Sequence, residues 1–202
     1  PVKGRINKWA ALALLGKVQL YQNKFSESAT SLDQVINSMQ YQLISDFRSL
    51  FTVGNEGHSE AVFDIQYSGL EGGSYGCLIC LEGNAAPGYQ GIRQYDGPIY
   101  SDGNSYNLPT QDLYASFEVA DDIRRNATVL DIDSFISQQT NPGAISYAVG
   151  GGGHTGLYNN KYIKKQAELG LLDNDLTSPV NYIVIRFADV LLMAAEAHNR
   201  SN

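Results

Sequence analysis

Two neighbouring segments near the start of the chain carry apolar and small residues at helical spacing, and they constrain the fold most. Between Ile6 and Tyr21 these residues form one stripe, which consists of Ala10, Ala13, Leu14, Gly16, Leu20 and Tyr21. After a short turn at Gln22–Lys24, the pattern returns from Phe25 to Ile36. Amphipathic helices bury such stripes against one another. The sequence therefore predicts an antiparallel helical hairpin, a degenerate repeat of the tetratricopeptide type.

Later segments predict a few strands and another long helix. Ala61–Gln66 has the pattern of a strand, and Tyr182–Ile185 is strand-like and leads into a helix from Arg186 to Asn199. We therefore expect a mainly α fold, in which tetratricopeptide-like helical hairpins form an α-α superhelix. A long irregular, loop-rich insertion and a few short strands complete the prediction.

The middle of the chain predicts only short elements. Thr110 can cap a short helix that runs to about Phe117, Asp121–Arg125 fits a charged turn, and Thr128–Ile132 fits a short strand. Residues 141–160 are expected to form a surface loop. We thus expect a helical hairpin with a short strand at 1–66, a ligand-binding excursion at 67–180, and the start of the next core hairpin at 181–202.

Charge and aromatic content limit the possible ligands. Lys and Arg total 14 against 21 Asp and Glu, which gives a formal charge of -7, so a nucleic-acid backbone would gain no electrostatic attraction. Thirteen tyrosines and twenty glycines accompany one tryptophan, and loops of this composition build amphipathic contact surfaces. The composition argues against nucleic acid as a partner and favours a polar, ring-shaped ligand.

The candidate binding residues lie in residues 67–108, a stretch with six tyrosines, many glycines and two prolines but no sustained period. It is too long for a plain connector, so we interpret it as a functional loop. The candidate set is Tyr89, Arg93, Tyr95, Asp96, Tyr100, Asp102, Asn104 and Tyr106. An aromatic ring can stack on the C–H face of a sugar while carboxylates, amides and arginine bond its hydroxyls. In the alternative interpretation the rings pack the loop onto the helices, and the two Asp-Gly pairs form turns.

Residues that could support catalysis or metal binding form no recognised pattern. Cys77 and Cys80 have redox-motif spacing but sit in a Gly-rich stretch, so a structural pair, a disulfide and redox chemistry all stay open. No second Cys or His pair completes a zinc site. The Gly150–Gly153 run lacks the neighbours that a phosphate-binding loop needs, and His154 fits a solvated loop residue. We predict no metal ligand and no cofactor, although bound calcium stays an open question.

An enzyme is the rival class, and the sequence gives it little support. A glycosidase needs two carboxylates about 5 to 10 Å apart. Asp96, Asp102, Asp121 and Asp122 would allow such a pair, but nothing singles out two of them. Serine hydrolase signatures are missing as well. We therefore predict a non-enzymatic protein with no catalytic residues.

The ends of the sequence predict a fragment of a longer protein. No run of eighteen apolar residues is present, no signal-peptide segment stands at the start, and no Met precedes Pro1.

Three stretches, taken in order, resemble the SusD/RagB family of outer-membrane nutrient-binding lipoproteins, and together they span most of the chain. The first runs from Gly4-Arg5 through AALALLGKVQLY (10–21), VI (35–36), YQL (41–43) and LF (50–51) to EAVFDIQ (60–66). The second is LYASF (113–117), which leads to DDIRR (121–125). The third, NYIVIRFADVLLMAAEA (181–197), is nearly a family signature. Within it, the i,i+3 spacing of Arg186 and Asp189 suits helix packing.

The resemblance implies a core of four tetratricopeptide-type hairpins with a ligand-binding loop region attached. It also implies a lipid-modified Cys that holds the protein on the outer membrane, a residue that neither Cys77 nor Cys80 can be. The implied partner is a TonB-dependent transporter of the SusC type. We expect a surface-exposed lipoprotein that captures an oligosaccharide or polysaccharide for that transporter. A RagB-like peptide-import lipoprotein and a helical-repeat interaction scaffold are the alternatives.

Overall fold

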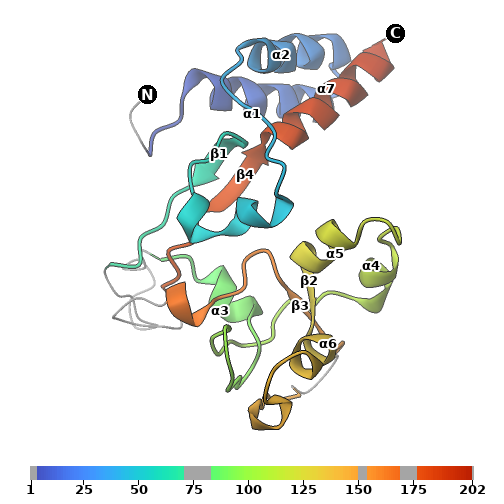
Figure 1. Cartoon of the computed structure of the whole chain (residues 1–202). Coiled ribbons are helices and arrows are strands. Elements are labelled where there is room, and N and C mark those ends of the chain that lie inside the picture. The colour runs from blue at the N-terminus through green and yellow to red at the C-terminus, as the bar shows by residue number, and fades with distance from the viewer. Residues whose placement is uncertain (1–3, 71–82, 150–153, 169–176, 202) are drawn as a thin grey trace. The chain divides into compact units, whose positions relative to one another are not determined.

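The structure is a computed structural model of the 202-residue chain, and it describes residues 4–70, 83–149, 154–168 and 177–201. The chain divides into two compact units, whose elements are labelled in Figure 1. Unit 1 consists of residues 1–46, 55–66 and 181–202, and unit 2 consists of residues 47–54 and 67–180. The prediction of a mainly helical fold with a few short strands is confirmed.

Helices α1 (Lys8–Tyr21) and α2 (Phe25–Asn37) form the predicted hairpin of unit 1. Asn7 caps α1, because its side-chain oxygen accepts hydrogen bonds from two backbone amides of the first turn, each at 2.9 Å. A Cβ atom on Gly16 would lie 2.6 Å from the Cγ of Leu32. The glycine therefore permits a close approach of the two helices.

The buried face of α1 differs in part from the predicted stripe. Its buried residues are Ala10, Ala13, Gly16 and Leu20. Leu14 and Tyr21, which belong to the same predicted stripe, are 38% and 79% exposed. Apolar residues surround most of this helix, so periodicity alone could not select its buried face. The close packing of Gly16 against Leu32 selects it instead.

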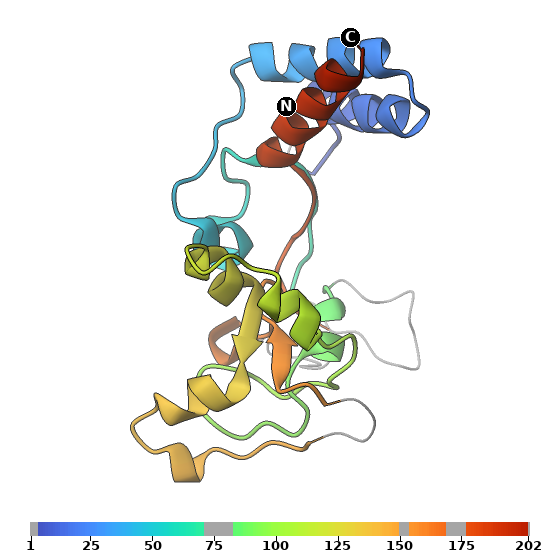
Figure 2. The same cartoon turned by 90° about the vertical axis from the view of Figure 1, so that its right-hand side faces the viewer.

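Strands β1 (Ala61–Ile65) and β4 (Tyr182–Arg186) lie far apart in the sequence and pair antiparallel in unit 1. Helix α7 (Phe187–Ser201) follows β4 directly and packs against α2, as Figures 1 and 2 show. The core of unit 1 consists of Ala13, Leu32, Val35, Val62, Ile185, Val190 and Ala194. The predicted strand and helix at the end of the chain are thus both present.

A buried carboxylate connects three segments of unit 1. Glu60 is 2% exposed, accepts a 3.0 Å hydrogen bond from the backbone amide of Ile44, and lies 3.4 Å from the guanidinium of Arg186. Arg186 also pairs with Asp189 at 3.1 Å. The role of Arg186 and Asp189 is thus structural, as predicted, but Arg186 ends β4 and does not lie on a helix face, so the expected helix–helix packing by this pair is not observed.

The rest of the described residues form short elements. In chain order they are the 3₁₀ helices η1 (Phe47–Phe51) and η2 (Val53–Asn55), α3 (Ala86–Gln90), α4 (Gln111–Ala115), α5 (Asp122–Thr128), β2 (Val129–Asp131), α6 (Ile132–Ser137), η4 (Pro142–Ala144), β3 (Leu157–Asn159) and η5 (Gln166–Glu168). Strands β2 and β3 pair antiparallel. A second core, in unit 2, consists of Ile92, Tyr95, Tyr100, Leu130, Ile132, Tyr158 and Ile163.

Some local predictions in unit 2 are wrong. The predicted charged turn at Asp121–Arg125 is the start of α5, where the carboxylate of Asp121 pairs with Arg124 at 2.6 Å. The predicted strand at Thr128–Ile132 is shorter, because Thr128 ends α5 and Ile132 begins α6. The surface loop expected at 141–160 contains η4 and β3.

The predicted helix cap is confirmed, whereas the predictions on the cysteines and the glycine run concern residues outside the described ranges. The side-chain oxygen of Thr110 accepts a hydrogen bond from the backbone amide of Leu113 at 3.1 Å and caps α4 as expected. Cys77, Cys80 and Gly150–Gly153 lie outside the described residues. Within the described ranges, none of the helices has both the length and the hydropathy needed to cross a membrane.

Candidate ligand-binding site

Two segments of unit 2, residues 88–92 and 103–106, lie side by side and are joined by backbone hydrogen bonds. The amides of Gly103, Asn104, Ser105 and Tyr106 donate to the carbonyl oxygens of Ile92, Gly88, Gly91 and Tyr89, in that order, at 2.8 to 3.0 Å. We call this pair of segments the cradle. Four bonds between so few residues hold its backbone in one conformation.

Glycine is required where the two segments of the cradle come closest. A Cβ atom on Gly103 would lie 2.5 Å from both the Cα and the carbonyl carbon of Gly91. Backbone atoms cannot move aside as a flexible side chain can, so only glycine fits at position 103. The Asp-Gly pair at 102–103, interpreted from the sequence as a turn, thus also sets the spacing of the cradle.

The cradle presents two stacked tyrosine rings. The rings of Tyr89 and Tyr106 lie 6.2 Å apart between centroids, with an angle of 23° between their planes. Tyr106 is 60% exposed, whereas Tyr89 is half-buried at the end of α3. We call this pair the tyrosine platform. It combines an exposed aromatic ring with a second ring that stacks on it.

Polar side chains lie next to the residues of the tyrosine platform along the chain. The side-chain amide of Asn159, in β3, donates a 2.8 Å hydrogen bond to the side-chain oxygen of Gln90, next to Tyr89. The hydroxyl of Ser105, next to Tyr106, accepts a 3.0 Å bond from the backbone amide of Arg93. Asn104 is half-buried in the cradle. These side chains could bond the hydroxyls of a ligand that stacks on the rings.

Tyr95 and Tyr100, two other members of the candidate set, lie in the core of unit 2. They are 7% and 8% exposed; Tyr95 donates a 2.7 Å hydrogen bond to the carbonyl of Pro98, and the ring centroid of Tyr100 is 4.9 Å from that of Phe135. Burial raises the pKa of Tyr95, and raises the pKa of Tyr100 to about 12. These two rings take the packing role that the sequence left open as an alternative.

The charged members of the set lie mainly at the surface. Arg93, Asp96 and Asp102 are exposed. The backbone of Asp96 exchanges two hydrogen bonds with Ser146, at 2.8 and 2.9 Å. The carboxylate of Asp102 accepts a 2.8 Å bond from the amide of Gly103, which stabilises the turn. Of the eight candidates, the cradle thus brings together Tyr89, Asn104 and Tyr106, and Arg93 directly follows its first segment.

Sequence reasoning did not find Asn159 and Ser105. Asn159 comes close to Gln90 through the pairing of β3 with β2, and Ser105 comes close to Arg93 through the cradle. Both contacts join residues that are distant in the sequence, and neither residue belongs to a local motif. No signal in one sequence alone could have identified them.

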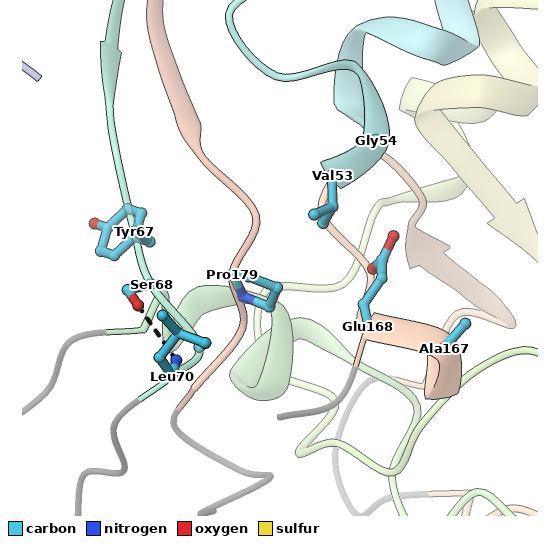
Figure 3. A pocket seen from close by; sticks show the side chains of 9 residues that line it. Val53, Gly54, Tyr67, Ser68, Leu70, Ala167, Glu168 and Pro179 are labelled. Carbon is cyan, nitrogen blue, oxygen red and sulfur yellow. Dashed lines mark hydrogen bonds between the residues drawn. The ribbon is translucent and has the colours of Figure 1, made fainter. Parts of the chain in front are cut away.

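A separate cavity of about 610 Å³ lies elsewhere in unit 2, and Figure 3 shows the side chains around it. Its lining includes Val53, Tyr67, Leu70, Glu168 and Pro179, and is mostly apolar. Glu168 pairs with Lys165 at 3.5 Å. The volume is within the range of about 300–1,000 Å³ that is typical of small-molecule sites. Tyr67 and Leu70 belong to the start of the candidate loop that the sequence singled out.

The sequence of this chain is similar to one protein family and to curated proteins of the same kind. The model of the SusD family matches residues 146–202. A SusD-like protein of Bacteroides ovatus is 27% identical over 217 residues, which cover 96% of this chain and 36% of that protein. The chain thus spans well under half the length of the curated relatives it matches.

Solved structures agree with the sequence relatives. A laminarin binding SusD-like protein has a TM-score of 0.86 at 33% identity, over 97% of this chain and 44% of that one. Surface glycan-binding protein A from Bacteroides fluxus has a TM-score of 0.82 at 27% identity, over 96% of this chain and 40% of that one. Sequence and fold agree, and the chain is similar to SusD-like proteins across almost its whole length.

Proposed function

We propose that this chain is the ligand-capturing part of a surface glycan-binding protein, and that it binds carbohydrate at the tyrosine platform without turning it over. One observation carries the proposal: Tyr106 is 60% exposed while its ring stacks on Tyr89. An exposed aromatic ring that is already held in place suits a sugar ring, whose C–H face is apolar and whose edges bear hydroxyls.

The surrounding polar groups suit neutral hydroxyls. The amides of Gln90 and Asn159 and the side chain of Asn104 supply both donors and acceptors. A hydrogen bond of this kind contributes only about 0.5 to 1.5 kcal/mol. A single platform should therefore bind with micromolar to millimolar affinity, on the order of −4 to −8 kcal/mol. A long polymer that engages several copies at the cell surface would be held more tightly.

The solved relatives suggest which glycan to test first. The neighbour at 33% identity is named as laminarin binding, and another structure with the same fold was determined in complex with laminarihexaose. We propose laminarin-type polysaccharide as the first ligand class. Delivery to a TonB-dependent transporter of the SusC type and attachment to the outer membrane as a lipoprotein complete the proposal, because they are the roles that the family resemblance implies.

Native affinity electrophoresis through gels that contain laminarin, xyloglucan or starch tests the proposal directly. We expect laminarin to retard the chain, and we expect Tyr106→Ala to reduce that retardation. If no polysaccharide retards the chain while a peptide pool binds saturably, glycan capture is wrong and the RagB-like peptide alternative takes its place. Release of reducing ends from any of these polymers would contradict the non-catalytic assignment.

A further inference from the structure

Left-handed backbone conformations cluster around the tyrosine platform. Among the described residues, six that are not glycine have a positive φ, between 50° and 72°. Four of them fall within residues 94–107, namely Gln94, Ile99, Ser105 and Asn107. Residues with a side chain rarely adopt this region, because their Cβ atom then crowds the backbone carbonyl oxygen. Such conformations persist only where surrounding contacts impose them, and they are frequent at functional sites.

The two residues outside this stretch have an ordinary explanation. Asn23 and Met39, with φ of 58° and 55°, follow the ends of α1 and α2, and their amides donate hydrogen bonds back to these helices at 3.0 and 3.3 Å. A left-handed residue is common directly after a helix. No helix ends at Ser105 or Asn107, so their conformation requires another cause.

Ser105 and Asn107 flank Tyr106, the exposed ring of the tyrosine platform. The amide of Ser105 donates a 2.8 Å hydrogen bond to the carbonyl of Gly91, and its hydroxyl accepts a 3.0 Å bond from the amide of Arg93. These two bonds hold Ser105 on the cradle with a φ of 56°. Asn107 has a φ of 55° and is exposed, and asparagine adopts this conformation more readily than most residues. The backbone thus has a left-handed residue immediately before and after the ring.

We propose that Ser105 and Asn107 are positioning residues, whose left-handed backbone holds the ring of Tyr106 on Tyr89, where a ligand can stack on it. If either residue took the negative φ that L-residues prefer, the chain would leave the cradle in another direction and the two rings would separate. The expected effect on affinity rests on the proposed glycan binding at the tyrosine platform. The effect on the ring itself is independent of any ligand.

Substitution of Asn107 separates backbone conformation from side-chain chemistry. Asn107→Val disfavours a positive φ, because its branched Cβ crowds the backbone. It should weaken polysaccharide binding about 2- to 10-fold, as expected for loss of the aromatic contact of Tyr106. Asn107→Gly permits the positive φ and should lose less affinity than Asn107→Val. Both variants lack the side-chain amide, so equal losses of affinity would assign the effect to that amide and overturn the proposal.

Asn23→Val is the matched control, because Asn23 is also an exposed asparagine with a positive φ, and it belongs to unit 1. It should lower the free energy of unfolding about as much as Asn107→Val does and leave polysaccharide binding unchanged. Equal losses of binding in the two valine variants would trace the effect to lower stability and would contradict the positioning role. If Asn107→Val does not fold, Asn107→Ala and Asn23→Ala replace the pair, since alanine disfavours the same conformation.

NMR on the chain without ligand measures the position of the ring directly. Magnetisation transfer between the ring protons of Tyr89 and Tyr106 should be present in the wild type and in Asn107→Gly, and lost in Asn107→Val and Ser105→Val. A wild-type chain that shows this contact but binds no polysaccharide would refute the proposed function and leave the positioning role intact. A contact that persists in both valine variants would overturn the positioning role, whether or not polysaccharide binds.

Discussion

The backbone amide of Tyr106 donates a 2.8 Å hydrogen bond to the carbonyl oxygen of Tyr89, and the rings of the same two residues stack 6.2 Å apart. Backbone pairing therefore fixes the positions from which the rings extend. A ligand that stacks on the ring of Tyr106 does not have to order the loop first. Pre-organisation of this kind lowers the entropic cost of binding, so that weak stacking contacts can still give a favourable binding free energy.

Replacement of the exposed ring tests the platform. Tyr106→Ala should weaken polysaccharide binding about 2- to 10-fold, because an aromatic contact contributes about 0.5–1.5 kcal/mol beyond its buried area. Its stability should change by less than about 0.5 kcal/mol, since the side chain is mostly exposed. Affinity electrophoresis and urea denaturation measure the two quantities. Tyr21→Ala, at a tyrosine that is 79% exposed in unit 1, is the control; an equal loss of binding in both variants would contradict the assignment.

The spacing of the cradle can be changed without touching either ring. Gly103→Ala places a methyl group 2.5 Å from the backbone of Gly91, so the two segments must separate and the rings must shift. We expect loss of polysaccharide binding together with a loss of stability of about 1–3 kcal/mol. Gly143→Ala, where a Cβ would meet nothing within 4 Å, should alter neither. Wild-type binding by Gly103→Ala would show that the geometry of the cradle does not matter.

The buried Glu60 should be important for unit 1. Glu60→Ala leaves Arg186 without one of its carboxylate partners and the amide of Ile44 without an acceptor. We expect a loss of about 3 kcal/mol, the lower end for a broken buried ion pair, since Asp189 remains. Glu196→Ala removes an exposed pair with Arg200 and should cost less than about 1 kcal/mol. Chemical denaturation compares the two variants, and equal losses would refute the structural role of Glu60.

The raised pKa of Tyr100 predicts how the free energy of unfolding changes at alkaline pH. Burial raises its pKa from 10.0 to about 12 in the folded chain. Above pH 10 the unfolded chain therefore binds fewer protons than the folded chain, and the free energy of unfolding falls until about pH 12. Over this pH range the free energy of unfolding falls by about 2–3 kcal/mol. Tyr100→Phe keeps the ring that packs on Phe135 and should show a smaller fall between these pH values; an unchanged fall would exclude Tyr100 as its source.

Sequence patterns predicted unit 1 well because its elements depend on local periodicity. The hairpin from Lys8 to Asn37, strand β1 and helix α7 all appear where apolar spacing placed them. The choice of buried face on α1 was only partly predictable, since Tyr21 is exposed although it continues the apolar stripe. That choice depends on the contact between Gly16 and Leu32, which belong to different helices.

Unit 2 was less predictable because contacts between distant residues decide its structure. Tyr95 and Tyr106 looked alike in the sequence, yet Tyr95 is buried and Tyr106 is exposed. The difference arises from the backbone bonds of the cradle and from packing against residues such as Ile132 and Tyr158. Composition could point to this region as the place for a ligand, but it could not say which ring would face the solvent.

The antiparallel pairing of β1 with β4 places Ile65 opposite Tyr182, so residues 67–180, the larger part of unit 2, leave and re-enter unit 1 at neighbouring points. Any segment whose own ends meet could be grafted onto these two points without disturbing the helices. Lengthening such a segment twofold costs only about 0.6 kcal/mol in loop closure. Natural selection could therefore exchange or enlarge the segment that carries the proposed sugar-binding site while the helices of unit 1, fixed by contacts such as Gly16 with Leu32, stay the same.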